Sequence, residues 1–170
     1  SIVVRIQVEL ADGDTEFIWK LSVDNYGTTP IFAVDFPVFG VKPMGETPED
    51  DFLVLSGLSG TLIQNPYGDH RRRVETYQMV DPEVGGSANG EYPGNYIMQF
   101  SAVYDSSSGL YWATRDTMGY VKQYSSYGAE EKILVFTRHF PENNQVALLH
   151  WELPYDFVMV PYRGDWIDAA

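Results

Sequence analysis

The chain has 170 residues, and its 24 acidic and 11 basic residues give a formal net charge of −13. So acidic a protein repels nucleic acids and anionic lipid surfaces, and we therefore exclude both as partners. The sequence contains no cysteine, which excludes a disulfide framework, a thiolate metal site and a cysteine nucleophile. The cellular compartment stays open, export to a bacterial periplasm included.

Alternating apolar and polar residues at the start of the chain predict three antiparallel strands. Ile2–Leu10 alternates in this way, and Glu16–Val23 returns as its partner after a turn at Ala11–Asp14. Pro30–Phe36 predicts a third strand, closed by Pro37. We expect the three strands to form one meander.

The next stretch predicts two short strands and one long irregular segment. Phe52–Leu55 and Gly60–Gln64 are the strands. Asp81–Gly94 shows no periodicity and is rich in glycine, proline and asparagine. Long ordered loops in compact domains are more often functional than decorative, and disorder is the competing interpretation.

The central stretch predicts an antiparallel meander at the middle of the domain. Asn95–Tyr104 alternates strictly, Asp105–Gly109 is a polar turn that ends in glycine, and Leu110–Arg115 returns. Thr117–Tyr124 predicts a third strand of this meander.

Three further strands are predicted near the end of the chain, at Glu131–His139, Gln145–Leu153 and Tyr155–Val160. About ten or eleven strands joined by short turns favour an all-β antiparallel sandwich over a small barrel. We expect one sandwich domain over residues 1–162. Residues 163–170 predict the start of a helix that Asp165 caps, and we expect this helix to lead into a further domain.

Three stretches together resemble a known arrangement. They are Trp19–Gly40 (WKLSVDNYGTTPIFAVDFPVFG), Tyr92–Lys122 and the terminal Pro161–Ala170 (PYRGDWIDAA). Their order resembles the amino-terminal, galactose-mutarotase-like β-sandwich (a supersandwich) of bacterial glycoside hydrolases such as the endo-α-N-acetylgalactosaminidases. In those proteins a segment like GDW-x-x-AA looks like the entry helix into a catalytic (β/α)8 barrel.

This resemblance implies an accessory domain whose partner is the catalytic barrel of the same polypeptide. The catalytic carboxylates of such enzymes lie in the barrel, so the resemblance carries no catalytic residue over to this chain. It implies a carbohydrate-active parent protein and leaves the sugar and the linkage open.

His150 and Glu152 are the candidate catalytic pair. On a strand they share one face and lie close enough for acid–base chemistry, and mutarotases themselves use a histidine and a glutamate. The competing and favoured interpretation is a structural histidine beside a surface glutamate. No nucleophile elbow and no phosphate-binding glycine loop is present, so we expect no cofactor.

Asp12, Asp14 and Glu16 are a candidate metal site, because alternating carboxylates can bind Ca²⁺ through oxygen atoms. A complete calcium loop needs more ligands, and Asp-Gly between two alternating runs already predicts a hairpin. We therefore expect no metal. Glu49-Asp50-Asp51 is a weaker candidate of the same kind, since charge runs are usually solvated.

Two features suggest contact with a sugar or a neighbouring domain. His70, Arg71 and Arg73 belong to a basic tract, and guanidinium groups bind carboxylates in pairs of hydrogen bonds. A plain surface strand is an equally good interpretation of that tract. Tyr92 is the aromatic residue that we expect to be exposed for stacking on a sugar ring.

The leading hypothesis is a non-catalytic β-sandwich domain of a glycoside hydrolase, which supports the barrel and lends the Asp81–Gly94 loop to the rim of its active site. A free-standing carbohydrate-binding module is the first alternative, and it requires a coplanar set of exposed aromatic residues. A small mutarotase-like sugar isomerase that uses His150 and Glu152 is the second.

Overall fold

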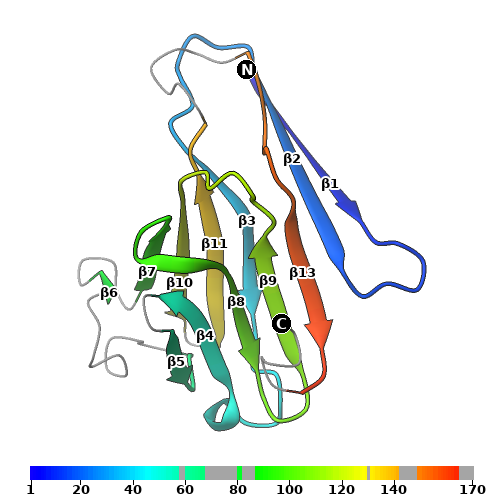
Figure 1. Cartoon of the computed structure of the whole chain (residues 1–170), viewed down its shortest axis with the longest axis vertical. Helices are drawn as coiled ribbons and strands as arrows, with labels where there is room; N and C mark the ends of the chain where they lie inside the picture. Colours follow the sequence, from blue (N-terminus) through cyan, green and yellow to red (C-terminus); the bar gives the residue numbers. More distant parts are fainter. Residues whose placement is uncertain (58–59, 68–79, 82–86, 130, 142–148, 165–170) are drawn as a thin grey trace.

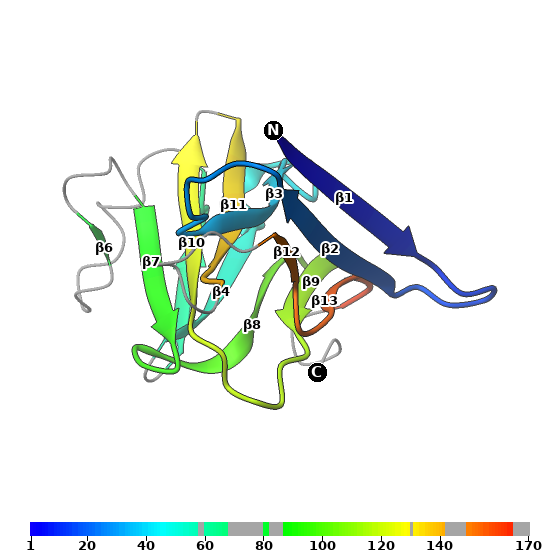
Figure 2. The ribbon, with the colours of Figure 1, turned by 90° about the horizontal axis from the view of Figure 1, so that it is seen from above.

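The computed structural model describes residues 1–57, 60–67, 80–81, 87–129, 131–141 and 149–164. Two antiparallel sheets pack face to face as a sandwich (Figure 1, Figure 2). The predicted all-β antiparallel sandwich is therefore confirmed. Within the described part of the chain the one helical element is a short 3-10 turn at Pro48–Asp50 (η1), and no helix there could span a membrane.

The larger sheet has eight strands. In hydrogen-bonded order these are β1 (Ile2–Glu9), β2 (Phe17–Asn25), β13 (Phe157–Tyr162), β9 (Gly109–Thr114), β8 (Tyr96–Tyr104), β4 (Phe52–Gly57) and β5 (Thr61–Gln64), while β12 (His150–Glu152) also pairs with β2. The sequence predicted two of these pairings correctly. β1 pairs with β2 from Ile2–Asn25 to Glu9–Ile18, and β8 pairs with β9 across the short turn.

The smaller sheet has five strands. In order these are β3 (Val34–Val41), β11 (Lys132–His139), β10 (Lys122–Ala129), β7 (Ser87–Tyr92) and β6 (Val80–Asp81). In Figure 2, β3, β11, β10 and β7 form one layer and β13, β9 and β8 form the other. The hairpin of β1 and β2 reaches outward beyond the smaller sheet in both views (Figure 1, Figure 2).

Both predicted meanders are wrong in their third strand. The third strand of each crosses to the other sheet, because β3 pairs with β11 and β10 pairs with β7 and β11. Thr117–Tyr124 is mostly a turn rather than a strand, since the Asp116 carboxylate accepts the amide N–H groups of Met118 and Gly119 at 2.8 and 3.0 Å. The strand starts only at Lys122.

Two other boundaries also differ from the prediction. Pro37 lies inside β3 instead of closing a strand, which is possible because β3 is the edge of its sheet and a proline there withholds no ladder donor. The segment Asp81–Gly94 was predicted as an irregular loop, yet it contains β7.

The chain bends at Arg163 and Gly164 after β13, and the described residues contain no C-terminal helix. The helix was predicted over residues 163–170, of which 165–170 lie outside the described part. Of the Gln145–Leu153 strand, the structure shows His150–Glu152, and residues 145–148 lie outside the described part as well.

The hydrophobic core lies between the two sheets. Its largest members are the inward-facing side chains Leu53, Ile63, Tyr96, Trp112, Tyr124, Ile133 and Phe157. A second, smaller cluster of Leu21, Val23 and Phe36 packs against Trp151 and Leu153 under β2 and β12. Alternation along each strand produces this core, because every second residue points inward.

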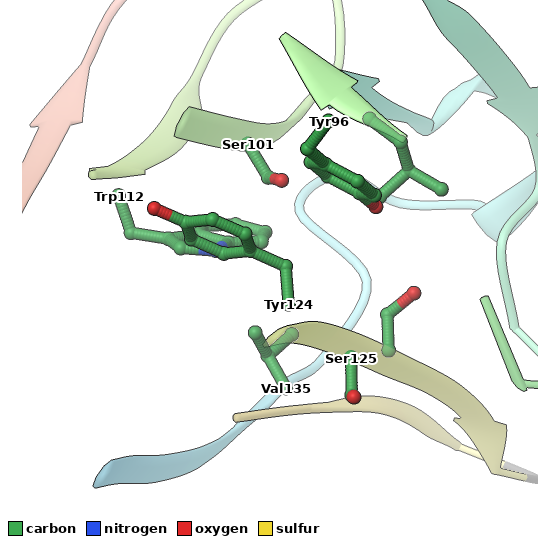
Figure 3. A pocket seen from close by; sticks show the side chains of 8 residues that line it. Tyr96, Ser101, Trp112, Tyr124, Ser125 and Val135 are labelled. Carbon is green, nitrogen blue, oxygen red and sulfur yellow. The ribbon is translucent and has the colours of Figure 1, made fainter. Parts of the chain in front are cut away.

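A small pocket lies inside the sandwich between Tyr96, Trp112 and Tyr124 (Figure 3). Its volume is about 10 Å³, close to the least space that one water molecule needs. The buried hydroxyls of Tyr96 and Ser126 have no hydrogen-bond partner among the described residues, and both residues line the pocket. These hydroxyls and the cavity size fit a single buried water.

Candidate functional site

His150 and Glu152 lie together on the solvent side of β12. The His150 Nε2 atom lies 3.1 Å from Glu152 Oε1, and His150 Nδ1 lies 2.6 Å from Asp24 Oδ1. Trp151, between them in the sequence, packs against the smaller core cluster. Strand alternation therefore places the histidine and both carboxylates on one face, as the spacing of His150 and Glu152 predicts.

The contacts favour a charged His150. Its pKa lies above the usual value because the ring hydrogen-bonds to Asp24, which is the larger cause, and to Glu152. The pKa of Asp24 lies below its usual value because it accepts hydrogen bonds from His150 and from Arg5. The Arg5 guanidinium contacts the second carboxylate oxygen of Asp24. These contacts link Arg5, Asp24, His150 and Glu152 into one surface network.

This network is poorly arranged for proton transfer. Both ring nitrogens of His150 already face carboxylate oxygens, whereas a general base needs a free nitrogen directed at its substrate. The side chains of His150 and Glu152 are 52% and 70% exposed. An open groove lies beside them between β2 and residues 152–156, and Glu152 and Arg5 line it but His150 does not.

The candidate metal ligands are not gathered into one site. The Asp14 carboxylate accepts the amide N–H groups of Thr15 and Glu16 at 2.7 and 3.1 Å, as a turn aspartate does. Glu16 instead pairs with Arg115 at 2.5 Å. In the described part of the chain no three histidine or carboxylate side chains are close enough together to hold a metal ion. Asp12 is exposed in the same turn.

One member of the second acidic cluster has a structural role. Asp51 is fully buried, although we expected that charge run to be solvated. One of its carboxylate oxygens accepts the Tyr67 hydroxyl at 2.6 Å and the Met44 amide at 2.9 Å. These bonds tie the Met44 loop to the start of β4.

Tyr92 is not the exposed aromatic residue that the sequence suggested. It ends β7, is half-buried and packs against the main core cluster. The Lys122 ammonium group lies 4.8 Å from the centre of its ring. The other proposed ligand-binding residues, His70, Arg71 and Arg73, lie outside the described residues.

A buried polar cluster around Lys122 was missed by the sequence analysis. The Lys122 ammonium group is fully buried, contacts the Asp116 carboxylate and donates to Gln99 Oε1 at 2.8 Å. It also lies 4.4 Å from the centre of the Tyr155 ring. Lys122 and Tyr124 are two positions apart in β10, so their side chains lie on the same face of the strand. This spacing was the signal that Lys122 faces inward.

In the Lys122–Asp116 pair, each residue favours the charged form of the other. Burial lowers the pKa of Lys122, while Asp116 acts against that shift. Burial acts to raise the pKa of Asp116, but the hydrogen bonds from Lys122 and from the Met118 amide outweigh it, and that pKa stays below its usual value. The buried lysine therefore connects β10 of the smaller sheet to Gln99 of β8 in the larger sheet, and it is closed to a substrate.

The outer face of the larger sheet is the most distinctive surface of the molecule. Leu53, Val103, Trp112 and Phe157 point into the core, so their neighbours along the strands point outward. These neighbours are again apolar. We call this surface the aromatic face, and it consists of Phe52, Val54, Phe100, Ala102, Tyr104, Tyr111, Ala113 and Val158.

Strand register explains how the aromatic face is built. Phe52 stacks on Tyr104, and Phe100 stacks on Tyr111, each pair with ring centres 5.5 Å apart. Phe100 is opposite Ala113, and Tyr111 is opposite Ala102. Large rings thus alternate with small residues, and the small residues are buried: Ala102 is 0% exposed and Ala113 is 6% exposed.

A shallow groove on this face has polar groups at one end. Phe100, Tyr111, Val158 and Val160 line its apolar part, and Glu16 and Arg115 close the end beyond β9. The sequence predicted both strands that carry Phe100 and Tyr111, but it did not predict that their outward residues form one apolar surface. A scan of the sequence against known protein families finds no match, and a comparison with curated proteins also finds none.

Proposed function

We propose that this chain is a non-catalytic β-sandwich domain of a carbohydrate-active enzyme, and that its aromatic face packs against the catalytic (β/α)8 barrel of the same polypeptide. The aromatic face is the observation that carries this proposal. Antiparallel sheets with one solvated face normally have polar residues on that face. Here the outward-facing residues of the central strands β8, β9 and β13 are apolar instead.

The composition of the face supports contact with protein. Aromatic residues are enriched and charged residues are depleted at the centres of protein interfaces. Glu16 and Arg115 form an ion pair at the margin of the groove, where the polar rim of an interface is expected. The galactose-mutarotase-like class and the glycoside hydrolase activity of the parent enter the proposal from the sequence resemblance.

Oxidative footprinting of this chain alone and within its longest natural polypeptide tests the proposal. We expect modification of Tyr111 and Phe100 to fall in the longer protein, because the aromatic face is then covered. Tyr26, which is 64% exposed at the far end of β2, is the matched control and keeps its reactivity. Equal modification of Tyr111 in both proteins, or a gene that stops at Ala170, would contradict the proposal.

A free-standing carbohydrate-binding module is a second candidate, and the stacked aromatic pairs favour it. Aromatic rings pack on the apolar faces of sugars, and polar groups beside them fix orientation. The groove that Phe100 and Tyr111 share with Arg115 offers both. A glycan array tests this function: binding that is lost in Tyr111→Ala but kept in Tyr26→Ala supports the module, and no binding to any glycan removes it.

A further inference from the structure

The edge strand β1 is exposed in an unusual way. Every second residue of β1 lies on the sheet face that carries Leu21 and Val23 of β2. The smaller sheet does not cover these β1 residues. The exposed fractions of this apolar row are Ile2 57%, Val4 53%, Ile6 56% and Val8 47%. Figure 2 shows why, since the β1–β2 hairpin projects past the smaller sheet.

The backbone edge of β1 is also open to pairing. Among the described residues β1 pairs only with β2, so its other edge offers free N–H and C=O groups. Natural edge strands normally avoid self-pairing by prolines, bulges, short length or inward-pointing charges. β1 has eight residues, contains no proline, pairs without a bulge, and has no charge in its apolar row.

We propose that β1 pairs antiparallel with β1 of a second copy of this chain, about a two-fold axis at Gln7. This pairing joins the two larger sheets into one continuous sheet. Ile6 then lies opposite the partner's Val8, and Val4 lies opposite the partner's Leu10. The apolar rows of the two strands are thereby brought into lateral contact, as cross-strand pairs in sheets are.

Charge complementarity selects both the partner and the register. With Gln7 opposite itself, Arg5 lies opposite the partner's Glu9, and this pair occurs twice across the axis. Arg5 already contacts Asp24, and Glu9 already bonds Lys20 at 3.1 Å. The pairing therefore extends two existing ion pairs into a row of alternating sign.

Neighbouring registers lack this complementarity. A two-fold axis at Arg5 would place like charges directly opposite each other, which destabilises a sheet. An axis at Ile6 would pair Arg5 with the partner's Gln7 and leave Glu9 opposite the partner's Val3. Shifts by a single residue would place the polar row opposite the apolar row.

Disulfide trapping tests the register directly, because the chain has no native cysteine. In Gln7→Cys the two thiols lie on directly paired residues, whose Cα atoms are about 4.5–5.5 Å apart and can be bridged. In the control Val3→Cys the two thiols are offset by about 26 Å along the strands. Both positions are exposed, so neither change disturbs the core.

We expect a covalent dimer under mild oxidation for Gln7→Cys and none for Val3→Cys. Equal cross-linking of both variants, or no cross-linking of either, overturns the proposal. A wild-type chain that stays monomeric in sedimentation equilibrium at about 1 mM overturns it as well, since specific complexes bind more tightly than this.

A charge exchange supplies an independent check. Arg5→Glu and Glu9→Arg alone each place like charges opposite each other, and we expect each to weaken the dimer at least about tenfold, or 1.4 kcal/mol. The double variant Arg5→Glu/Glu9→Arg restores opposite charges across the axis but leaves both contacts within each chain, to Asp24 and Lys20, broken. Recovery of dimerisation in the double variant therefore reports the contact between copies, and failure to recover contradicts it.

Discussion

The fold lowers the pKa of His139 and raises the pKa of His150. Burial lowers the pKa of His139 to about 4, because the ring lies in the core and only its neutral form is accommodated. Its Nε2 atom donates to the Phe36 carbonyl at 2.6 Å, and its Nδ1 atom accepts the Tyr155 hydroxyl at 2.7 Å. His150 is exposed and paired with carboxylates, and its pKa is raised.

The first prediction concerns the acid stability that depends on His139. Below a pH of about 6.5 the unfolded chain binds a proton at this histidine that the folded chain does not, so the free energy of unfolding falls as the pH falls toward 4. The shift corresponds to about 3 kcal/mol. Urea unfolding from pH 7 to pH 4.5 should show this loss in the wild type and a flatter dependence in His139→Gln.

His150→Gln is the matched control for this experiment. Because the folded pKa of His150 is raised, its contribution to stability is complete below the unfolded pKa and disappears as the pH rises through the folded pKa. Its removal should therefore leave the acid-side loss in place. Identical pH profiles for wild type and His139→Gln would show that His139 is protonated without cost in the folded state.

Strands are the scale at which the sequence was most informative. β1, β8, β9 and β11 were predicted within a few residues, because each is a run rich in β-branched and aromatic residues that ends at polar or turn residues. Alternation does not state which sheet a strand joins, so β3 and β10 were assigned to the wrong partners. β7 was missed because its sequence, SANGEY, lacks an apolar alternation.

The second prediction concerns β10 and its buried lysine. Lys122→Met leaves Asp116 buried without its partner, and we expect the free energy of unfolding to fall by about 3–5 kcal/mol. Lys20→Met, at the exposed pair with Glu9, should change it by no more than about 1 kcal/mol. Both values follow from urea denaturation at neutral pH. A loss below about 1 kcal/mol for Lys122→Met would mean that Asp116 accepts a proton or water at little cost.

At the scale of the whole molecule, the candidate sites combine residues that are distant in the sequence. Asp24 meets His150 although the two are 126 positions apart, and Glu16 meets Arg115 across 99 positions. Local patterns predicted the common face of His150 and Glu152, but nothing local predicted Asp24 or Arg5 beside them. The aromatic face was hidden for the same reason, since its members come from four strands.

The third prediction compares two neighbouring residues on the two sides of the larger sheet. Trp112 is 1% exposed and fills the core, so Trp112→Ala should lower the free energy of unfolding by about 3–5 kcal/mol. Tyr111→Ala, on the aromatic face, should cost clearly less, because this ring is still partly open to water. Thermal and urea unfolding of both variants provide the comparison. Equal losses would mean that the aromatic face is already part of the core in the isolated chain.

Because Lys122 is buried, chemical modification of its side chain can report unfolding of the protein. Lys20, Lys42 and Lys132 are the other lysines of the chain, and all three are exposed. An amine-reactive reagent can therefore modify those three in the native protein, while it reaches Lys122 only when the two sheets separate. The rate of Lys122 acylation, with the other lysines as internal references, measures how often the sandwich opens.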